Sequence, residues 1–306
     1  AIEKGVKNIE GRISTATKNE NTGFIESLTL ETGEIIEGDL FIDCTGFDAL
    51  LIEKTLQTGF EDWSHLLPCD AAVAVQTEQT SAVISPFTRS IALGEGWRWC
   101  IPLQNRMGNG YVYSRRHISD DEATATLLRE VDGQPLNEPR VIKHRPGIRR
   151  KVWNKNCVAI GLSGGFLEPL ESTGIHLFMM GVVRLIQLFP FNGINQSLED
   201  QYNNLTAGEL TSIRDFIILH YHATQRTDTQ FWQDCKLRAI PSTLAHRIDL
   251  FKNSAQAYQG SHELFRVDSW LQVMLGQGIT PKHYHDSVSM MSENNLHKFL
   301  SSIKAP

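Results

Sequence analysis

Residues 157–177 read Cys-Val-Ala-Ile-Gly-Leu-Ser-Gly-Gly-Phe-Leu-Glu-Pro-Leu-Glu-Ser-Thr-Gly-Ile-His-Leu, and this stretch decides the fold. Its first five residues predict a buried strand, and the glycines that follow predict a loop. The strongly apolar run 175–189 predicts a helix that ends at Pro190. A buried strand that leads through a Gly-rich loop into a helix is typical of an α/β fold.

The same loop has the properties of an anion site. Gly164 and Gly165 allow the backbone to approach a ligand or to adopt a positive φ. The unpaired N–H groups and the positive dipole end of the following helix favour an anion. Glu171 and Ser172 lie just before that helix and could instead serve only as its cap. Because caps are common, the residues alone favour the cap.

The first half of the chain carries strand patterns. Residues 1–48 predict strands over 6–13, 24–31, 34–36 and 38–46, and residues 49–57 predict a short helix stopped by Gly59. An antiparallel sheet is predicted from the alternating segments 71–76, 88–93, 97–103 and 110–115. Ser119 and Glu122 form a capping box, which predicts a helix to about Glu130. A further strand is predicted over 140–144.

Two-residue alternation stops near residue 195, and helical patterns follow over 198–224, 241–258 and 292–303. We therefore expect residues 1–48 and 151–196 to form an α/β core and residues 49–150 to form a β-sheet layer. Residues 197–306 are expected to form a mostly helical part.

Composition excludes several classes of protein. The 306 residues include 29 basic and 35 acidic side chains, a net charge of −6, which argues against a nucleic-acid partner. No apolar run reaches the roughly 20 residues of a membrane-spanning helix. Five scattered cysteines are typical of a reducing compartment, so we expect a cytoplasmic location. The pairs His220/His222 and His283/His285 are interpreted as surface or core residues, and no metal site is expected.

Trp97 and Trp99 flank Arg98 on a predicted strand, so their side chains point to one face. They could close an aromatic core, or they could form a wall between two compartments. The pattern alone leaves both options open.

Three segments together resemble the flavin-dependent tryptophan halogenase family. Trp97-x-Trp99-x-Ile101-Pro102 is similar to its WxWxIP motif, residues 166–175 to its FLEPLESTGI segment, and residues 39–46 to its DLFIDCTG strand. The segments occur in the family's order, and the similarity extends over roughly residues 1–250. The resemblance implies a flavin monooxygenase-like fold, with an FAD-binding core, the antiparallel sheet layer and a helical C-terminal substrate part.

The resemblance also implies a reaction. FAD, as FADH2 from a separate flavin reductase, would react with O2 to a flavin hydroperoxide that oxidises chloride or bromide. The oxidised halogen would then substitute an electron-rich small aromatic substrate such as tryptophan or indole. Flavin carries the redox chemistry in such a reaction, and the protein supplies position and electrostatics.

Residue roles are implied in the same way. Glu171 would stabilise the cationic intermediate and take its proton, with Ser172 in support, and the backbone of Thr173 and Gly174 would bind the halide. Trp97 and Trp99, with Ile101 and Pro102, would form a barrier between substrate and flavin. The implied cofactor-binding residues are Ile13, at the adenine edge, and Leu162, Ser163, Gly164, Gly165 and Ile175.

The chain also departs from the family. It contains no GxGxxG segment, and the family's essential Lys belongs to that same region. We therefore expect both in a missing N-terminal segment of the same protein, and a homodimer stays open. Residues 269–278 differ from the aromatic-rich segment of enzymes that take free tryptophan, which leaves the substrate open. The alternatives are a non-catalytic remnant or binding subunit, and a hydroxylating flavin monooxygenase, against which the two tryptophans argue.

Overall fold

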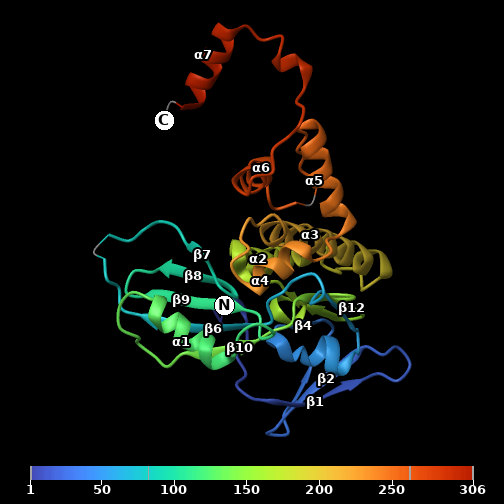
Figure 1. Cartoon of the computed structure of the whole chain (residues 1–306). Helices are drawn as coiled ribbons and strands as arrows, with labels where there is room; N and C mark the ends of the chain where they lie inside the picture. Colours follow the sequence, from blue (N-terminus) through green and yellow to red (C-terminus); the bar gives the residue numbers. More distant parts are fainter. Residues whose placement is uncertain (1, 82, 262, 305–306) are drawn as a thin grey trace. The chain divides into compact units, whose positions relative to one another are not determined.

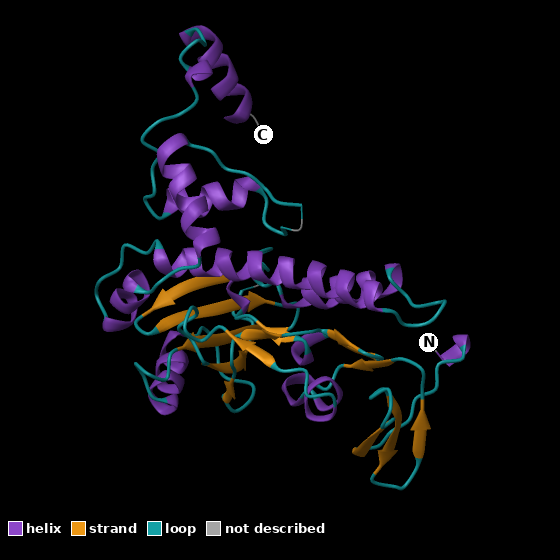
Figure 2. Cartoon of the chain, turned by 90° about the vertical axis from the view of Figure 1, so that its right-hand side faces the viewer, coloured by secondary structure: helices purple, strands orange, loops and turns teal. Residues whose placement is uncertain are grey.

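The computed structural model describes residues 2–81, 83–261 and 263–304 (Figure 1). The chain divides into two compact units, residues 1–210 and 211–306. Among the described residues, strands occur only in the first unit, and the second is helical (Figure 2). The long helix α3, Gln196–His222, runs across the division.

In its described residues, the first unit contains four small sheets. One has the order β1-β2-β3 and another the order β10-β6-β9-β8-β7. The other two have the orders β14-β11-β5 and β12-β13-β4. The strands are β1 Ile13–Lys18, β2 Ile25–Leu30, β3 Ile35–Glu37, β4 Phe41–Asp43, β5 Phe60–Asp62, β6 Ala71–Thr77, β7 Arg89–Leu93, β8 Gly96–Pro102, β9 Met107–Tyr113, β10 Arg140–Lys143, β11 Gly147–Arg149, β12 Trp153–Asn154, β13 Cys157–Ala159 and β14 Gly165–Phe166.

The five-stranded sheet is antiparallel throughout, as the alternating segments predict. Helix α1, Asp120–Glu130, covers one face, and its Ala123 and Leu127 are buried against Val73, Tyr111 and neighbouring side chains. Ser119 and Glu122 form the predicted capping box at the start of this helix. The other face of the sheet carries Trp97 and Trp99.

A second group of buried apolar side chains, separate from the one between α1 and the five-stranded sheet, is centred on the parallel pair of β4 and β13. Cys157 pairs with Phe41 and Ala159 with Asp43, and Ile25 and Ile52 pack against them. The pair brings the end of β4 next to the start of the Gly-rich loop.

Asp43 is fully buried at the end of β4 and joins several segments. Its carboxylate accepts hydrogen bonds from the N–H groups of Thr45, Leu51 and Ile52 and from the hydroxyls of Thr45 and Ser163, at 2.6–3.1 Å. Burial by itself raises the pKa of Asp43, but these hydrogen bonds outweigh it and hold the pKa below its usual value.

Two predicted elements differ from the structure. The strand predicted over 6–13 is wrong for most of that range, because residues 6–12 are exposed and β1 pairs with β2 only from Ile13 onward. The helix predicted over 49–57 is a π-helix, Leu50–Thr55. The Leu50 N–H donates to the Thr45 hydroxyl, the Leu51 and Ile52 N–H groups donate to Asp43, and the Lys54 N–H donates to the Ala49 carbonyl five residues back.

The second unit consists of the end of α3, α4 Gln230–Leu237, α5 Ser242–Ser254, α6 Val267–Gly276 and α7 Glu293–Lys304. Phe216 stacks on Phe265 at 4.0 Å and meets Trp270 edge-on at 4.8 Å. The Arg247 guanidinium lies 4.0 Å from the Trp270 ring and donates to the Tyr258 carbonyl. Helices α4 and α6 lie in the part that is expected to be mostly helical, but outside the individual ranges 198–224, 241–258 and 292–303.

No disulfide bond joins the five cysteines, all of which lie in the described part of the chain. Among the described residues, no helix is both long enough and apolar enough to cross a bilayer.

We expect Asp43→Asn to lower the free energy of unfolding at pH 7 by about 2–4 kcal/mol, because an amide NH₂ would face buried N–H donors. Since the folded-state pKa lies below the usual 3.8, the wild-type contribution is present above pH 3.8 and disappears as pH falls below it. Urea unfolding at pH 7 and pH 3 measures both effects. Asp39→Asn, at an exposed carboxylate on the same segment, is the control and should change stability little; equal loss in both variants would contradict the prediction.

Candidate functional site

The Gly-rich loop passes through several short elements before it reaches the helix. After β13 it forms a 3-10 turn at Gly161–Ser163, pairs with β11 as β14, and makes a second 3-10 turn at Pro169–Glu171. Helix α2, Gly174–Gln187, begins next. The predicted sequence of strand, loop and helix is therefore present, with the loop fixed to its surroundings along its length.

Gly165 is required by packing of the chain on itself, and Gly164 is tightly packed. A Cβ atom at Gly165 would lie 2.6 Å from the Gly147 carbonyl oxygen on β11. A Cβ atom at Gly164 would lie 3.2 Å from the Ala159 carbonyl oxygen and 3.3 Å from Val152. The close backbone approach that these glycines predict is thus an approach to neighbouring strands.

The start of α2 is open. Its first helical hydrogen bond joins the Leu177 N–H to the Thr173 carbonyl at 3.0 Å, so the N–H groups of Gly174, Ile175 and His176 have no helical acceptor. A Cβ atom at Gly174 would meet nothing within 4 Å. The Thr173 hydroxyl is buried and has no hydrogen-bond partner in the described part of the chain. Together these features offer donors and space to a small anion.

Glu171 and Ser172 immediately precede this open start. The N-cap of α2 is Thr173, whose side chain makes no capping hydrogen bond, so neither Glu171 nor Ser172 holds the cap position. Ser172 is exposed and adopts a left-handed conformation, with φ 56°, which is strained for a residue with a side chain. Glu171 is half-buried, at the end of the second 3-10 turn.

Trp97 and Trp99 lie on one face of β8, with ring centroids 6.1 Å apart. Trp97 is buried and Trp99 is half-buried. Opposite Trp99 on β9 stands Gly110, where a Cβ atom would lie 2.0 Å from the Trp99 ring. Because Gly110 has no side chain, the Trp99 ring can pack directly against the backbone of β9. Ile101 and Pro102 follow on the same strand and are half-buried.

The sheet face that carries the tryptophans contacts the loop. The Trp97 indole N–H donates to the Glu168 carboxyl at 3.3 Å, and the Ser90 hydroxyl on β7 donates to the Leu170 carbonyl at 3.3 Å. Because Ser90 pairs with Trp99, both contacts come from the same face. The two tryptophans and the loop thus belong to one site.

The remaining predicted cofactor residues lie in different surroundings. Leu162 and Gly165 line a pocket of about 270 Å³, together with Phe47, Phe60, Phe166, Lys143, His144, Arg145 and Arg149. Burial lowers the pKa of His144 to about 4, so this ring is neutral at pH 7. Ser163 is buried and its hydroxyl donates to Asp43. Ile175 is 73% exposed, and Ile13 is half-buried at the start of β1, in the three-stranded β1-β2-β3 sheet.

Comparison with known proteins identifies the family. The family model described as tryptophan halogenase matches residues 1–293. The chain belongs to the tryptophan halogenase family.

Individual members are similar over most of this chain. Tryptophan 6-halogenase SttH of Streptomyces toxytricini is 37% identical over 283 residues, which are 90% of this chain and 54% of the relative. Tryptophan 7-halogenase RebH of Lentzea aerocolonigenes is 36% identical over 303 residues, 92% of this chain and 56% of the relative. The solved structure of Xcc4156, a flavin-dependent halogenase from Xanthomonas campestris, is 50% identical with a TM-score of 0.96, and the match covers 99% of this chain and 61% of that one. The chain spans about half the length of the curated relatives it matches.

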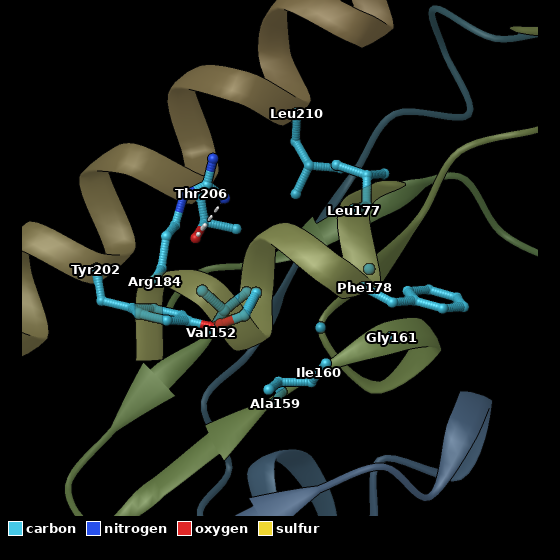
Figure 3. Close-up of a pocket in the computed structure, with 13 residues that line it drawn as sticks. Val152, Ala159, Ile160, Gly161, Leu177, Phe178, Arg184, Tyr202, Thr206 and Leu210 are labelled. Atoms are coloured by element: carbon cyan, nitrogen blue, oxygen red, sulfur yellow. Dashed lines mark hydrogen bonds between the residues drawn. The ribbon is translucent and has the colours of Figure 1, made fainter. Parts of the chain in front are cut away.

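This member of the tryptophan halogenase family also contains a polar cluster that its sequence does not reveal. Between α2 and α3, the buried Glu209 carboxylate accepts hydrogen bonds from Arg184 at 2.7 Å and pairs with His176 at 2.9 Å. Arg184 also reaches Thr206, on one side of a pocket of about 40 Å³, as Figure 3 shows. The residues are separated widely in sequence, and only the packing of the two helices brings them together.

Gly110→Ala should displace the Trp99 ring, because the new Cβ atom would occupy the position of ring carbons. We expect the free energy of unfolding to fall by about 1–3 kcal/mol, with a change in tryptophan fluorescence. Gly108→Ala is a matched control on the same face of β9, since its Cβ atom would have no neighbour nearer than 3.7 Å. Chemical unfolding followed by tryptophan fluorescence distinguishes the two variants. If both variants have the same free energy of unfolding and the same fluorescence, the Trp99 ring does not depend on the missing side chain of Gly110.

Proposed function

We propose that residues 1–306 form the halide-side and substrate-side part of a flavin-dependent halogenase, which acts in the cytoplasm on an electron-rich aromatic such as tryptophan or indole. The observation that carries the proposal is the open start of α2, with Glu171 directly before it and the tryptophan face of β8 against the same loop. The family membership and the names of the relatives support the reaction class.

The chemistry follows from the positions of these residues. Chloride or bromide binds to the free N–H groups at Gly174, where the helix dipole adds attraction. Electrophilic substitution places positive charge on the aromatic ring, and the Glu171 carboxylate stabilises that charge and takes the ring proton. Ser172 supports Glu171 from the adjoining position. The bulk of Trp97 and Trp99, with Ile101 and Pro102 beyond them, keeps the aromatic substrate away from the flavin.

FAD is the cofactor in this proposal, and the residues present fit its ring side. The pocket at Leu162 and Gly165 is lined by aromatic rings and by Arg145 and Arg149, which suit a planar, electron-rich ring system. When bound in reduced form from a separate flavin reductase, FAD supplies the oxidation of the halide by O2. Gly164, Ser163, Ile13 and Ile175 are further proposed cofactor contacts. Because the Ser163 hydroxyl donates to Asp43 at 3.1 Å, we propose that Ser163 contacts the cofactor through its backbone.

The dinucleotide loop is proposed to come from a polypeptide segment outside residues 1–306, and α2 offers a surface for it. Apolar side chains at helical spacing are exposed along this helix: Ile175, Phe178, Met179, Val182 and Ile186. Ile42 on the edge strand β4 is 49% exposed as well. An apolar stripe of this kind is normally covered. A second copy of the chain is the competing occupant.

Met179→Glu tests whether a polypeptide segment packs on the apolar side chains of α2. If a segment packs on α2, the carboxylate introduced at position 179 is buried and should lower the melting temperature of the protein by at least about 5 °C. If position 179 is exposed, the melting temperature should not change. Gln187→Glu, at an exposed polar position of the same helix, is the control. Thermal unfolding and the mass in solution are measured together. An unchanged melting temperature would refute the proposal that a segment packs on α2. Dissociation of a dimer in Met179→Glu would instead show that a second copy of the chain packs on this helix.

The reaction itself is tested on the encoded protein with FAD, a flavin reductase, NADH, O2 and sodium bromide, with indoles and phenols as substrates and mass spectrometry as the readout. Glu171→Gln should lower the yield of brominated product by about 100-fold or more, because the base and the counter-charge are both lost. Glu26→Gln, at a carboxylate on β2, is the matched control and should keep the wild-type yield. A hydroxylated product from the wild type would indicate a monooxygenase, and no product with any substrate would favour a non-catalytic protein.

A further inference from the structure

Glu168 lies in the same loop as Glu171 but in a different environment. Its side chain is almost completely buried, with 1% of its surface exposed, and its Oε1 atom accepts the Trp97 indole N–H at 3.3 Å. A carboxyl group is rarely buried to this extent unless it has a specific partner. The two residues are separated by 71 positions in the sequence, so this contact ties the five-stranded sheet to the loop.

The contact determines the orientation of one tryptophan ring. An indole ring has a single N–H group, so a hydrogen bond to it fixes which edge of the ring faces the loop. The Trp99 ring is placed by its close fit over Gly110. The two rings are therefore positioned by different means, one by packing and the other by the Glu168 carboxyl.

The same carboxyl is connected to Glu171 through a rigid turn. Glu168 is the N-cap of the 3-10 turn Pro169–Glu171, and Pro169 fixes the backbone at its first position. The Ser172 N–H closes the turn on the Pro169 carbonyl at 3.0 Å. Holding Glu168 in place therefore holds the turn that ends in Glu171.

We propose that Glu168 is a positioning residue, which acts through its hydrogen bond to Trp97 to hold the tryptophan wall and the Glu171 turn in one fixed arrangement. This inference rests on the proposed halogenase function. Loss of the acceptor leaves the Trp97 ring and the turn free to shift. More of the O2 that takes two electrons and two protons from the reduced flavin is then released as hydrogen peroxide instead of oxidising the halide, and less product forms.

The test compares Glu168→Leu, which removes the acceptor, with Glu168→Gln, which keeps an acceptor oxygen. In the encoded protein labelled with ¹⁵N-tryptophan, Trp97→Phe assigns the indole signal of Trp97. Glu168→Leu should move that signal upfield and speed its exchange with water by about 10-fold, and Glu168→Gln should restore most of the wild-type value. In uniformly ¹⁵N-labelled protein, the backbone signals of residues 172–174 should shift in the Leu variant as well.

The second readout is coupling, the ratio of brominated product to O2 consumed. We expect Glu168→Leu to lower it about 5-fold with a matching rise in hydrogen peroxide, and Glu168→Gln to stay near wild type. The chain offers a matched control in Glu61, which accepts the indole N–H of Trp63 at 2.7 Å. Glu61→Leu removes the same type of bond and should leave coupling unchanged.

Several results would overturn the inference. An unchanged Trp97 signal in Glu168→Leu excludes the hydrogen bond, and a changed signal with wild-type coupling excludes the positioning role. If Glu61→Leu lowers coupling as much as Glu168→Leu does, the loss in Glu168→Leu results from general destabilisation and not from a positioning role. If Glu168→Leu does not fold, a Gln variant that loses the Trp97 signal position also contradicts the inference. If the wild type makes no brominated product, the proposed function fails, and the signals of Trp97 and residues 172–174 alone decide whether Glu168 positions them.

Discussion

The buried carboxylate of Asp43 is the constraint on which the rest of the site depends. Burial of a carboxylate is unfavourable, and here it is offset because backbone N–H groups and hydroxyls surround both oxygens. The donors come from the chain directly after β4, from the π-helix and from Ser163 in the Gly-rich loop. One side chain thus fixes the start of the loop relative to the β4–β13 pair, and it also accepts the Leu51 and Ile52 N–H groups in the first turn of the π-helix.

The loop is held a second time further along, by the five-stranded sheet. The contacts of Trp97 with Glu168 and of Ser90 with Leu170 fix the middle of the loop, as Asp43 fixes its start. Between these anchors the chain has little freedom, and it leaves the second turn through the left-handed Ser172. The first N–H groups of α2 lie directly after this segment and, as at any helix start, have no acceptor within the helix.

The sequence predicts the parts of this structure that are determined by residues close together along the chain. Alternation along β6 to β9 and the capping box at Ser119 are local signals, and the structure confirms the sheet and the helix that they predict. Gly164 and Gly165 were recognised as close-contact positions, but their partners are strand β11 and the backbone near Ala159. The acceptor role of Glu168 and the Glu209 cluster have no local signal, since their partners are set by tertiary packing. The family resemblance identified Glu171, Thr173 and Gly174, whose chemistry remains proposed.

The two glutamates of the loop show how a short sequence can separate two roles. Residues three apart in a 3-10 helix lie on the same face, so Glu168 and Glu171 would lie side by side if the turn began one residue earlier. Proline disfavours the helical conformation of the residue before it, and Glu168 accordingly adopts φ −58° and ψ 145°, outside the turn. Its side chain is buried against Trp97, whereas Glu171 ends the turn half-buried beside the open helix start. Pro169 therefore directs the Glu168 carboxyl against Trp97 and leaves the Glu171 carboxyl at the end of the turn, so a substitution of Pro169 should move both.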